Sequence, residues 1–437
     1  MLHPDFKSVG KGGSTEKALR SAEDRLEEAC GLVRAIDLEI ACCEIAKVSK
    51  INPATLVGPG KVEEIGARIT ETGADLVIFN TQISPGQQRN LERLWKVKVL
   101  DRTGLILEIF GRRARTREGR LQVDLAHLTY QKSRLVRSWT HLERQRGGVG
   151  FMGGPGERQI ESDRRVLQEK ISKIERQLDT VRNTRDLQRK ARKRVPTPVV
   201  ALVGYTNAGK STLFNRLTEA QVLAKDQLFA TLDPTMRKTV LPHGREVILS
   251  DTVGFISDLP TELVAAFHAT LEEVLEADLI LHVRDISHSD TEAQAGDVLT
   301  VLSELGIDET AQTKIAEVWN KTDLLDDDRL EPVENMAARS SNIVCTSALT
   351  GEGADNLLNL IEERLSARFK QVTILVPAGD GAGLSWVYRA GEVLERHHRE
   401  DGSVELEARL PAARFAEALS RHNLVILPQE ESQKAAQ

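Results

Sequence analysis

A glycine-rich loop at residues 204–211 reads Gly204-Tyr205-Thr206-Asn207-Ala208-Gly209-Lys210-Ser211. An apolar run at 197–203 precedes it and an amphipathic segment at 212–217 follows it, so the loop joins a buried strand to a helix. In this context the backbone N–H groups and the helix N-terminus surround phosphate groups. We expect Lys210 to contact the β- and γ-phosphates and the Ser211 hydroxyl to ligate Mg²⁺. The sequence therefore predicts a P-loop domain.

Two further segments supply the groups that such a domain needs around its metal. Asp251-Thr252-Val253-Gly254 follows an apolar strand about 40 residues after the loop. There Asp251 can bind Mg²⁺ through water, and the Gly254 N–H can meet the γ-phosphate. Phe229-Ala230-Thr231-Leu232-Asp233 lies between the two motifs, and we expect the Thr231 hydroxyl to close over Mg²⁺, with Thr235 as the alternative. Residues 226–237 and 254–262 are then the predicted switch loops.

The base is predicted to bind at Asn320-Lys321-Thr322-Asp323, which ends an apolar strand. The Asp323 carboxylate can accept two hydrogen bonds, from N1–H and the exocyclic amine of guanine, and adenine has no such pair of donors. Thr346-Ser347-Ala348 follows the next strand and is expected to complete the pocket with backbone N–H groups. The motifs together predict a GTPase domain over 199–368 that uses GTP, GDP and Mg²⁺.

Phe255 occupies the position after Gly254, where Ras-type GTPases carry the glutamine that orients the attacking water. A phenylalanine neither donates nor accepts a hydrogen bond. We therefore expect slow intrinsic hydrolysis unless a partner reshapes the site. Lys210, Thr231, Gly254 and Phe255 are the residues expected nearest to the reacting phosphate.

Residues 112–194 carry 23 Lys or Arg against 10 Asp or Glu, a local charge of +13 in a chain of net charge −6. Two apolar seams with heptad spacing predict paired helices. Their residues are Leu121, Leu125, Leu128, Leu135, Trp139 and Leu142, then Ile160, Leu167, Ile171, Ile174, Leu178 and Val181. We predict an antiparallel hairpin that extends about 40–50 Å from the body. Its uncharged glycine-rich tip spans 147–156.

The fold class is predicted to be α/β, with an N-terminal α/β domain carrying the hairpin, a central P-loop domain with a mixed, mostly parallel sheet and a small C-terminal α+β domain. The N-terminal subdomain covers 18–111, 195–198 form a linker, and 1–17 and 429–437 are expected to be disordered. In the C-terminal domain, 371–428, we expect strands at 372–376, 384–388 and 404–410. Helices are expected there at 391–397 and 411–419.

Composition limits the other possibilities. No run of 18 apolar residues and no secretory signal occurs, and four cysteines in 437 residues do not form a disulfide framework. We expect a cytoplasmic protein without a membrane span, with a partly membrane-associated location left open.

At this point the chain resembles the HflX-type GTPases of the translation-factor class. Besides the nucleotide motifs, the matching stretches include Val57-Gly-Pro-Gly-Lys-Val-Glu-Glu64, Gln87-Gln-Arg-Asn-Leu91, Asp101-Arg-Thr103, Glu118-Gly-Arg-Leu-Gln-Val123 and Gly156-Glu-Arg-Gln-Ile-Glu161. The resemblance implies a protein that binds the large ribosomal subunit near its peptidyl transferase region and separates the subunits of stalled ribosomes, typically under stress. It also implies some ATP hydrolysis.

Two other functions are alternatives to this one. A GTP-dependent regulator of another protein would use the heptad helices to dimerise, whereas the ribosome-binding protein is expected to be a monomer that contacts rRNA through its basic hairpin. An RNA-modifying enzyme has little support, because the sequence shows no Cys/His catalytic constellation and no second cofactor motif.

Overall fold

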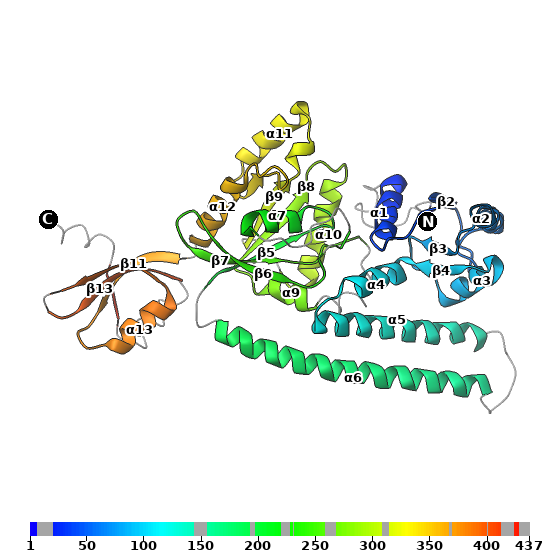
Figure 1. The fold of residues 1–437 in the computed structure, drawn as a ribbon, viewed down its shortest axis with the longest axis horizontal. Helices are drawn as coiled ribbons and strands as arrows, with labels where there is room; N and C mark the ends of the chain where they lie inside the picture. Colours follow the sequence, from blue (N-terminus) through cyan, green and yellow to red (C-terminus); the bar gives the residue numbers. More distant parts are fainter. Residues whose placement is uncertain are drawn as a thin grey trace.

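A computed structural model describes residues 1–6, 21–143, 155–192, 197–219, 228–229, 231–257, 268–307, 314–366, 369–399, 401–411 and 424–427. Three sheets follow one another along the chain, and a pair of long helices lies between the first and the second (Figure 1). The predicted α/β architecture, with its helical hairpin, central mostly parallel sheet and C-terminal α+β unit, is confirmed.

The N-terminal sheet is parallel, with strand order β2-β1-β3-β4. Its strands are β1 Leu2–Phe6, β2 Glu44–Val48, β3 Leu76–Phe79 and β4 Lys98–Asp101. Its helices are α1 Ala22–Arg34, α2 Pro59–Thr72, α3 Pro85–Trp95 and α4 Arg102–Arg113. Ser84 and Gln87 form a capping box that starts α3 after the strand, so a short local signal sets this boundary.

The expectation of a disordered segment over 1–17 is wrong for its first residues. Leu2 to Phe6 form β1, which pairs along its whole length with β2, and Leu2 is 3% exposed. Between Leu2 and Phe6 the segment consists of His3, Pro4 and Asp5, so its sequence shows no alternating apolar pattern. It is a strand because it completes the sheet between β2 and β3, which is a tertiary cause that composition does not reveal. Residues 7–20 lie outside the described residues.

The hairpin consists of α5, Arg117–Glu143, and α6, Pro155–Arg192. Ile171 and Leu178 of the predicted second seam are buried between the helices. The tip differs from the expectation at its end, because Pro155 and Gly156 already belong to α6, where a proline at the first helical position is well tolerated. Residues 147–154 lie outside the described part of the chain, as do the side chains of Trp139, Leu142 and Ile160.

The hairpin does not project freely from the body as expected. α5 packs against both α3 and α4, and α6 lies on the outer side of α5 (Figure 1). Val123 and Ala126, which are outside the predicted seam, are 3% exposed and belong to the main hydrophobic core. Asp101 at the end of β4 accepts hydrogen bonds from Tyr130 Oη at 2.6 Å and Arg134 Nη2 at 2.8 Å. A second face of α5 is therefore anchored to the N-terminal sheet.

The central sheet has strand order β10-β9-β8-β5-β7-β6 and is parallel except for β6, which is antiparallel to β7. Its strands are β5 Val199–Gly204, β6 Thr235–Val240, β7 Glu246–Asp251, β8 Leu279–Asp285, β9 Ile315–Asn320 and β10 Ile343–Cys345. The helices around it are α7 Lys210–Thr218, α9 His268–Leu275, α10 Thr291–Glu304, α11 Asp327–Ala338 and α12 Ala354–Ser366. The nucleotide motifs sit at the carboxyl ends of β5, β7, β9 and β10, the edge where parallel sheets bind ligands.

The C-terminal sheet is antiparallel, with order β12-β13-β11-β14. It contains β11 Phe369–Val376, β12 Glu392–His398, β13 Val404–Pro411 and β14 Val425–Leu427, covered by α13 Gly381–Ala390. Two expectations are wrong here. Residues 384–388 lie in α13 rather than a strand, and residues 392–397 lie in β12 rather than a helix.

The physical reasons are visible in the caps and the packing. Asp380 caps α13 by accepting from Gly383 N at 2.8 Å, and the helix buries Trp386 and Val387 against the sheet. β12 is a strand because it pairs with β13, and this pairing outweighs the low intrinsic strand preference of its charged residues. The helix expected at 411–419 lies outside the described residues except for Pro411, which ends β13.

No helix among the described residues is both long enough and apolar enough to cross a bilayer.

Candidate functional site

The phosphate loop connects β5 to α7. Gly204 has φ +154° and a side chain there would meet the Val283 carbonyl at 2.2 Å, while Gly209 has φ +89° and a side chain there would meet Asn320 Nδ2 at 2.1 Å. Both glycines are therefore required by close approaches of the neighbouring strands. Lys210 is buried, and its Nζ donates to the carbonyls of Gly204 at 3.1 Å and Tyr205 at 2.8 Å. This arrangement holds the ammonium group at the mouth of the loop.

Three oxygen-bearing side chains meet beside the loop. Ser211 Oγ lies 2.7 Å from Asp251 Oδ2, Thr231 Oγ1 lies 2.8 Å from the same oxygen, and the two hydroxyls are 2.9 Å apart. Thr235, the alternative to Thr231, lies instead in β6, opposite Asp251 in the sheet register. The structure thus brings Ser211, Thr231 and Asp251 together from three separate motifs.

These side chains fit a Mg²⁺ ion. Within the described ranges Asp251 Oδ1 is buried and has no hydrogen-bond partner, and burial raises the pKa of this carboxyl, with Lys210 acting in the opposite direction. A buried, incompletely paired carboxylate next to two hydroxyls is a hard oxygen donor set of the kind Mg²⁺ binds together with phosphate and water. The described residues contain no cluster of three His, Cys, Asp or Glu side chains.

Switch II, here residues 254–257 of the described chain, lies directly on the phosphate loop. Thr206 N donates to the Phe255 carbonyl at 2.7 Å, and Phe255 N donates to the Gly204 carbonyl at 3.1 Å. A side chain at Gly254 would come within 2.9 Å of Thr206 and 3.1 Å of Lys210 Nζ, so only glycine fits there. Thr252 is turned away from this contact, and its Oγ1 donates to the Leu202 carbonyl at 2.6 Å.

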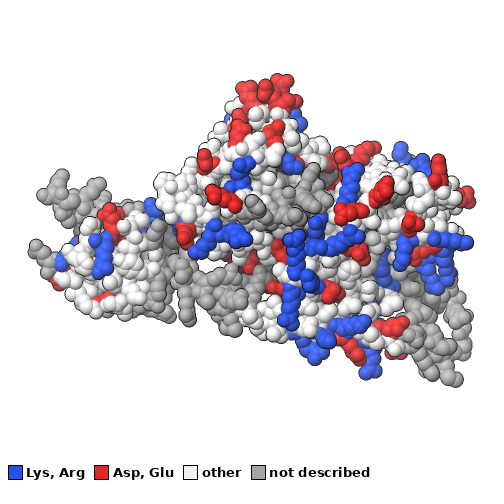
Figure 2. Space-filling view, in the orientation of Figure 1, with Lys and Arg blue, Asp and Glu red and all other residues white. Residues whose placement is uncertain are grey.

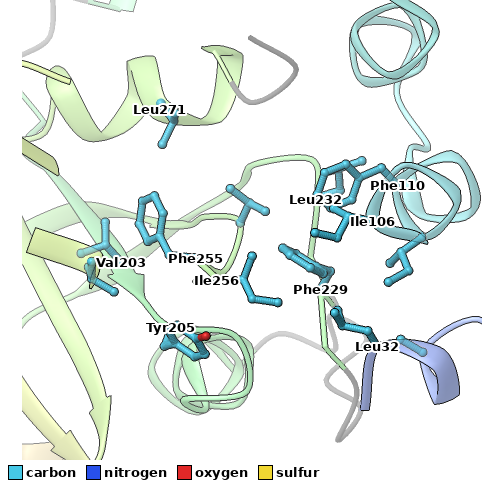
Figure 3. Packing of buried hydrophobic residues seen from close by; sticks show 14 of the residues in the cluster. Leu32, Ile106, Phe110, Val203, Tyr205, Phe229, Leu232, Phe255, Ile256 and Leu271 are labelled. Atoms are coloured by element: carbon cyan, nitrogen blue, oxygen red, sulfur yellow. The ribbon is translucent and has the colours of Figure 1, made fainter. Parts of the chain in front are cut away.

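Phe255, expected near the reacting phosphate, is a core residue. It is 4% exposed and packs with Val203 and Leu271 in the cluster shown in Figure 3. Val253 is buried in the same cluster. The position after Gly254 therefore contributes packing, and its side chain supplies no group that could hold a water molecule.

The base-binding motifs are organised around Asn320. Its Nδ2 donates to the Ala208 carbonyl at 2.8 Å, and its Oδ1 accepts from Ala348 N at 2.9 Å. Asp323 is exposed, and its Oδ1 accepts from Ser347 Oγ at 2.6 Å. Asn320 therefore links the phosphate loop to both base loops, while Asp323 is oriented by Ser347.

Five neighbouring residues make contacts that support these loops. Lys321 has φ +66° and pairs with Asp285 at 2.7 Å, and Thr322 N donates to the Thr346 carbonyl. The amides of Thr346, Ser347 and Ala348 donate to Trp319, Glu352 and Asn320 respectively. These bonds hold the loop in place beside Asn320 and Asp323.

Switch I, here Phe229 and 231–233, is fixed from the other side by the N-terminal domain. Phe229 is 2% exposed and Leu232 is 7% exposed, and both pack beside Phe110 and Ile106 of α4 (Figure 3). Asp233 binds the start of α5, as Arg115 N donates to its Oδ2 at 2.8 Å.

Ala230 and residues 226–227 and 258–262 of the predicted switches lie outside the described residues. Asn207, at φ +62°, occupies the tip of the phosphate loop.

A second contact joins the N-terminal domain to the phosphate loop and switch II. Glu28 of α1 accepts from Arg102 Nη2 at 2.5 Å and from the Tyr205 hydroxyl. Tyr205 Oη in turn accepts from Ser257 N at 3.0 Å, and Arg102 Nη2 donates to the Ser257 carbonyl at 3.1 Å. These residues had no predicted role in the site. Asp101-Arg102-Thr103 was visible only as a stretch of family resemblance, since no local motif links residue 28 to residue 257.

A glycine-rich phosphate loop, three converging oxygen-bearing side chains and the Asp323 carboxylate lie at one edge of a mostly parallel sheet, which is the arrangement of a P-loop GTPase. Residues 23–111 match the family model described as GTP-binding GTPase N-terminal, 113–192 match GTP-binding GTPase Middle Region, 199–321 match 50S ribosome-binding GTPase and 332–433 match HflX C-terminal domain. The chain belongs to the HflX family of GTPases. It is a GTP hydrolase that uses GTP, GDP and Mg²⁺, and its central domain is of the ribosome-binding class.

The relatives cover most of the chain. The GTPase HflX of Magnetococcus marinus is 50% identical over 91% of this chain and 90% of its own length. That of Escherichia coli is 48% identical over 82% of this chain and 83% of its own length. A GTP-binding protein from Sulfolobus solfataricus, solved in complex with GDP, is 23% identical over 84% of this chain and 99% of that chain, with a TM-score of 0.43.

Proposed function

We propose that this GTPase binds the large ribosomal subunit in its GTP state, contacts rRNA through the basic hairpin, and separates the subunits of stalled ribosomes under stress. One observation carries the proposal. Switch I, which bears Thr231 of the proposed metal site, is hydrogen-bonded through Asp233 to Arg115 and Thr116, which immediately precede α5. A nucleotide-dependent movement of switch I therefore acts directly on the element that carries the positive charge.

The site residues are assigned their roles as part of this proposal. Lys210 holds the β- and γ-phosphates, and the Gly254 N–H donates to the γ-phosphate. Ser211 and Thr231 ligate Mg²⁺ directly, and Asp251 does so through water. The ion, when bound, neutralises charge that develops on the phosphate oxygens. Asp323 selects guanine, and its fixed geometry makes ATP a poorer substrate; comparing turnover of the two nucleotides tests this.

Hydrolysis is proposed to need the ribosome. Because Phe255 is buried, its side chain cannot orient a water molecule at the γ-phosphate. A ribosomal contact that moves switch II or supplies a polar group would complete the site. The expected signature is a low basal rate that rises many-fold when large subunits are added.

The surface charge supports an anionic partner at the hairpin. In Figure 2, Lys and Arg gather where α4 meets α5, whereas Asp and Glu gather over α11. The exposed arginines at this junction are Arg112, Arg115, Arg117 and Arg120. They lie within a few residues of the Asp233 contact, so phosphate groups bound there would be close to switch I.

The packing of the hairpin disfavours the dimerising alternative. Ile171 and Leu178 are buried within the same chain, and Leu128 and Leu135 are half-buried. These seam residues are therefore not available for a second coiled-coil partner. We propose a monomer, and light scattering of the purified protein at micromolar concentration tests this.

Cosedimentation with isolated subunits tests the main proposal. We expect binding to large subunits with a non-hydrolysable GTP analogue and much weaker binding with GDP, decreasing with salt. The double variant Arg115→Ala/Arg117→Ala should reduce the salt dependence by about one to two units in log–log slope, since each phosphate contact contributes about 0.7–0.9. The matched control, Arg329→Ala/Arg339→Ala on exposed positions of the α11 region, should behave as the unmodified protein.

Shortening the predicted tip, residues 147–156, should spare basal GTP hydrolysis and abolish stimulation by ribosomes. Equal affinity for ribosomal particles with GTP analogue and GDP would refute the switch proposal. Unchanged splitting by the variant with the shortened tip would refute only the role of the tip.

A further inference from the structure

We propose that the N-terminal end of α5 is a functional part of the GTPase site: Thr116, just before the helix, and Gly119, in its first turn, are positioning residues that hold Asp233 and thereby place Thr231. The inference rests on the assignment of Thr231 to Mg²⁺ made above. It does not depend on ribosome binding.

The contact between Asp233 and the start of α5 uses both carboxylate oxygens. Oδ2 accepts from the backbone N–H groups of Arg115 at 2.8 Å and Thr116 at 2.9 Å. Oδ1 accepts from Thr116 Oγ1 at 2.5 Å. A carboxylate that accepts several N–H and O–H groups at a helix N-terminus is stabilised by charge-assisted hydrogen bonds and by the helix dipole. This is a specific binding site for one side chain of switch I.

Thr116 links this carboxylate to the helix itself. Its Oγ1 accepts from Gly119 N at 2.9 Å while it donates to Asp233, and its carbonyl accepts from Arg120 N at 3.1 Å. Thr116 therefore caps α5 and binds switch I with the same hydroxyl. Loss of this hydroxyl would loosen both the helix end and the switch.

Gly119 makes the close approach possible. A side chain at this position would lie 2.3 Å from Asp233 Oδ1 and 3.1 Å from Thr116 Oγ1, although the residue is in a regular helix and its conformation does not require glycine. Glycine at this position leaves the space that the Asp233 carboxylate occupies.

Successive side chains of switch I contact the N-terminal domain and the GTPase domain in turn. The side chains of Phe229 and Leu232 are buried in the core shared with α4, Thr231 reaches Asp251 in the metal site, and Asp233 reaches α5. Two residues of extended backbone span only about 6.5 Å, so a displacement of Asp233 also moves Thr231. The position of the Thr231 hydroxyl is consequently set from the hairpin as well as from the nucleotide.

This arrangement predicts a kinetic defect that nucleotide binding alone would not show. Thr231 is needed once the γ-phosphate is present, so GDP affinity should be nearly independent of it. Thr116→Ala in the full chain should lower kcat for GTP about tenfold and raise the Mg²⁺ concentration needed for half-maximal activity. GDP affinity should stay within about twofold. These magnitudes correspond to the loss of a hydrogen bond to a charged group.

Three further variants separate positioning from simple structural damage. Thr116→Ser keeps the hydroxyl and should restore activity to near the unmodified rate. Thr180→Ala removes a helix threonine whose Oγ1 donates to the Arg176 carbonyl within α6 at 3.0 Å, and should have no effect. Gly119→Ala should reproduce the Thr116→Ala defect, because its methyl group displaces the carboxylate.

The measurements are steady-state GTP hydrolysis over a Mg²⁺ titration and GDP binding by calorimetry, both without ribosomes. Unaltered kcat and Mg²⁺ requirement in Thr116→Ala would overturn the inference. So would a parallel loss of GDP affinity, or a failure of Thr116→Ser to recover activity, since either indicates a general structural role. Failure of the ribosome proposal would leave these results unchanged.

Discussion

The ring of Phe110 in α4 meets the ring of Phe229 in switch I edge-on, with centroids 4.9 Å apart and an interplanar angle of 89°. Phe229 also has φ +55°, an uncommon conformation for a bulky residue, and its side chain is almost fully buried. Burial in a core formed by another domain holds the backbone in this conformation. The N-terminal domain is therefore part of the surroundings that define switch I.

A double-mutant cycle should measure this contact. Phe110→Leu and Phe229→Leu should each lower the free energy of unfolding, and the pair should show a coupling of about 0.5–1.5 kcal/mol, the usual range for aromatic pairs beyond their buried area. Urea unfolding of the full chain gives the values.

The control cycle pairs Phe110 with Phe79, which lies in a separate core cluster and should give a coupling near zero. Additive effects for Phe110 and Phe229 would mean that the two rings do not meet in solution.

Lys210 should take up a proton when nucleotide binds at alkaline pH. Burial lowers its pKa to about 8, with the Asp251 carboxylate acting in the opposite direction. Phosphate groups favour the charged ammonium, so the bound state has the higher pKa. Above about pH 8 the free protein has lost the proton and the complex has regained it, so affinity must fall as pH rises.

Calorimetry of GDP binding at pH 8.5 in buffers of different ionisation enthalpy measures the uptake. The slope of the observed binding enthalpy against the buffer ionisation enthalpy gives the number of protons taken up, which should be roughly half a proton or more at pH 8.5. The slope should be smaller at pH 7.5, because most Lys210 side chains are already charged in the free protein. An observed enthalpy independent of the buffer at pH 8.5 would exclude the linkage. Lys210→Ala should abolish nucleotide turnover.

The meeting of the nucleotide motifs at one sheet edge was predictable because each is a short contiguous motif placed by its own strand. The contacts made by Glu28, Arg102 and Thr116 were not, since each joins residues more than 100 positions apart. The errors in the C-terminal domain have the same origin. Residues 384–388 contain Trp, Val and Tyr, which favour strands, but the Asp380 cap and burial of Trp386 over the sheet select a helix.

His282 should make the protein sensitive to acid. It is 1% exposed in β8, and burial lowers its pKa from 6.5 to about 4, with the nearby Glu317 acting in the opposite direction. Between these values the unfolded chain binds a proton that the folded chain does not, so the free energy of unfolding falls as pH drops from about 6.5 to about 4. The full effect is about 3 kcal/mol.

His282→Gln removes the titrating group and should flatten this dependence, measured as urea midpoints at pH 7 and pH 4.5. The exposed residue His398 provides the control, because His398→Gln should leave the pH dependence as it is. If His282→Gln lost as much stability at pH 4.5 as the unmodified protein, other groups would be responsible for the acid sensitivity.

Asp323→Asn should change the base preference from guanine to xanthine. The carboxylate, held by Ser347 Oγ at 2.6 Å, is assigned to accept from N1–H and the 2-amino group. An amide in its place offers one donor and one acceptor, which suits the 2-oxo group of xanthine. Hydrogen bonds to a charged group contribute about 1.5–3 kcal/mol, so GTP affinity should fall roughly 10- to 100-fold while affinity for the xanthine nucleotide rises.

Competition binding with GDP and xanthosine diphosphate gives the ratio directly. Asp326→Asn is the matched control, because it removes the same charge three residues away, where Asp326 caps α11 by accepting from Arg329 N at 3.0 Å. It should leave the preference for guanine intact. If Asp323→Asn retained that preference as well, the base would have to bind elsewhere, and the assignment of 320–323 to base recognition would fail with it.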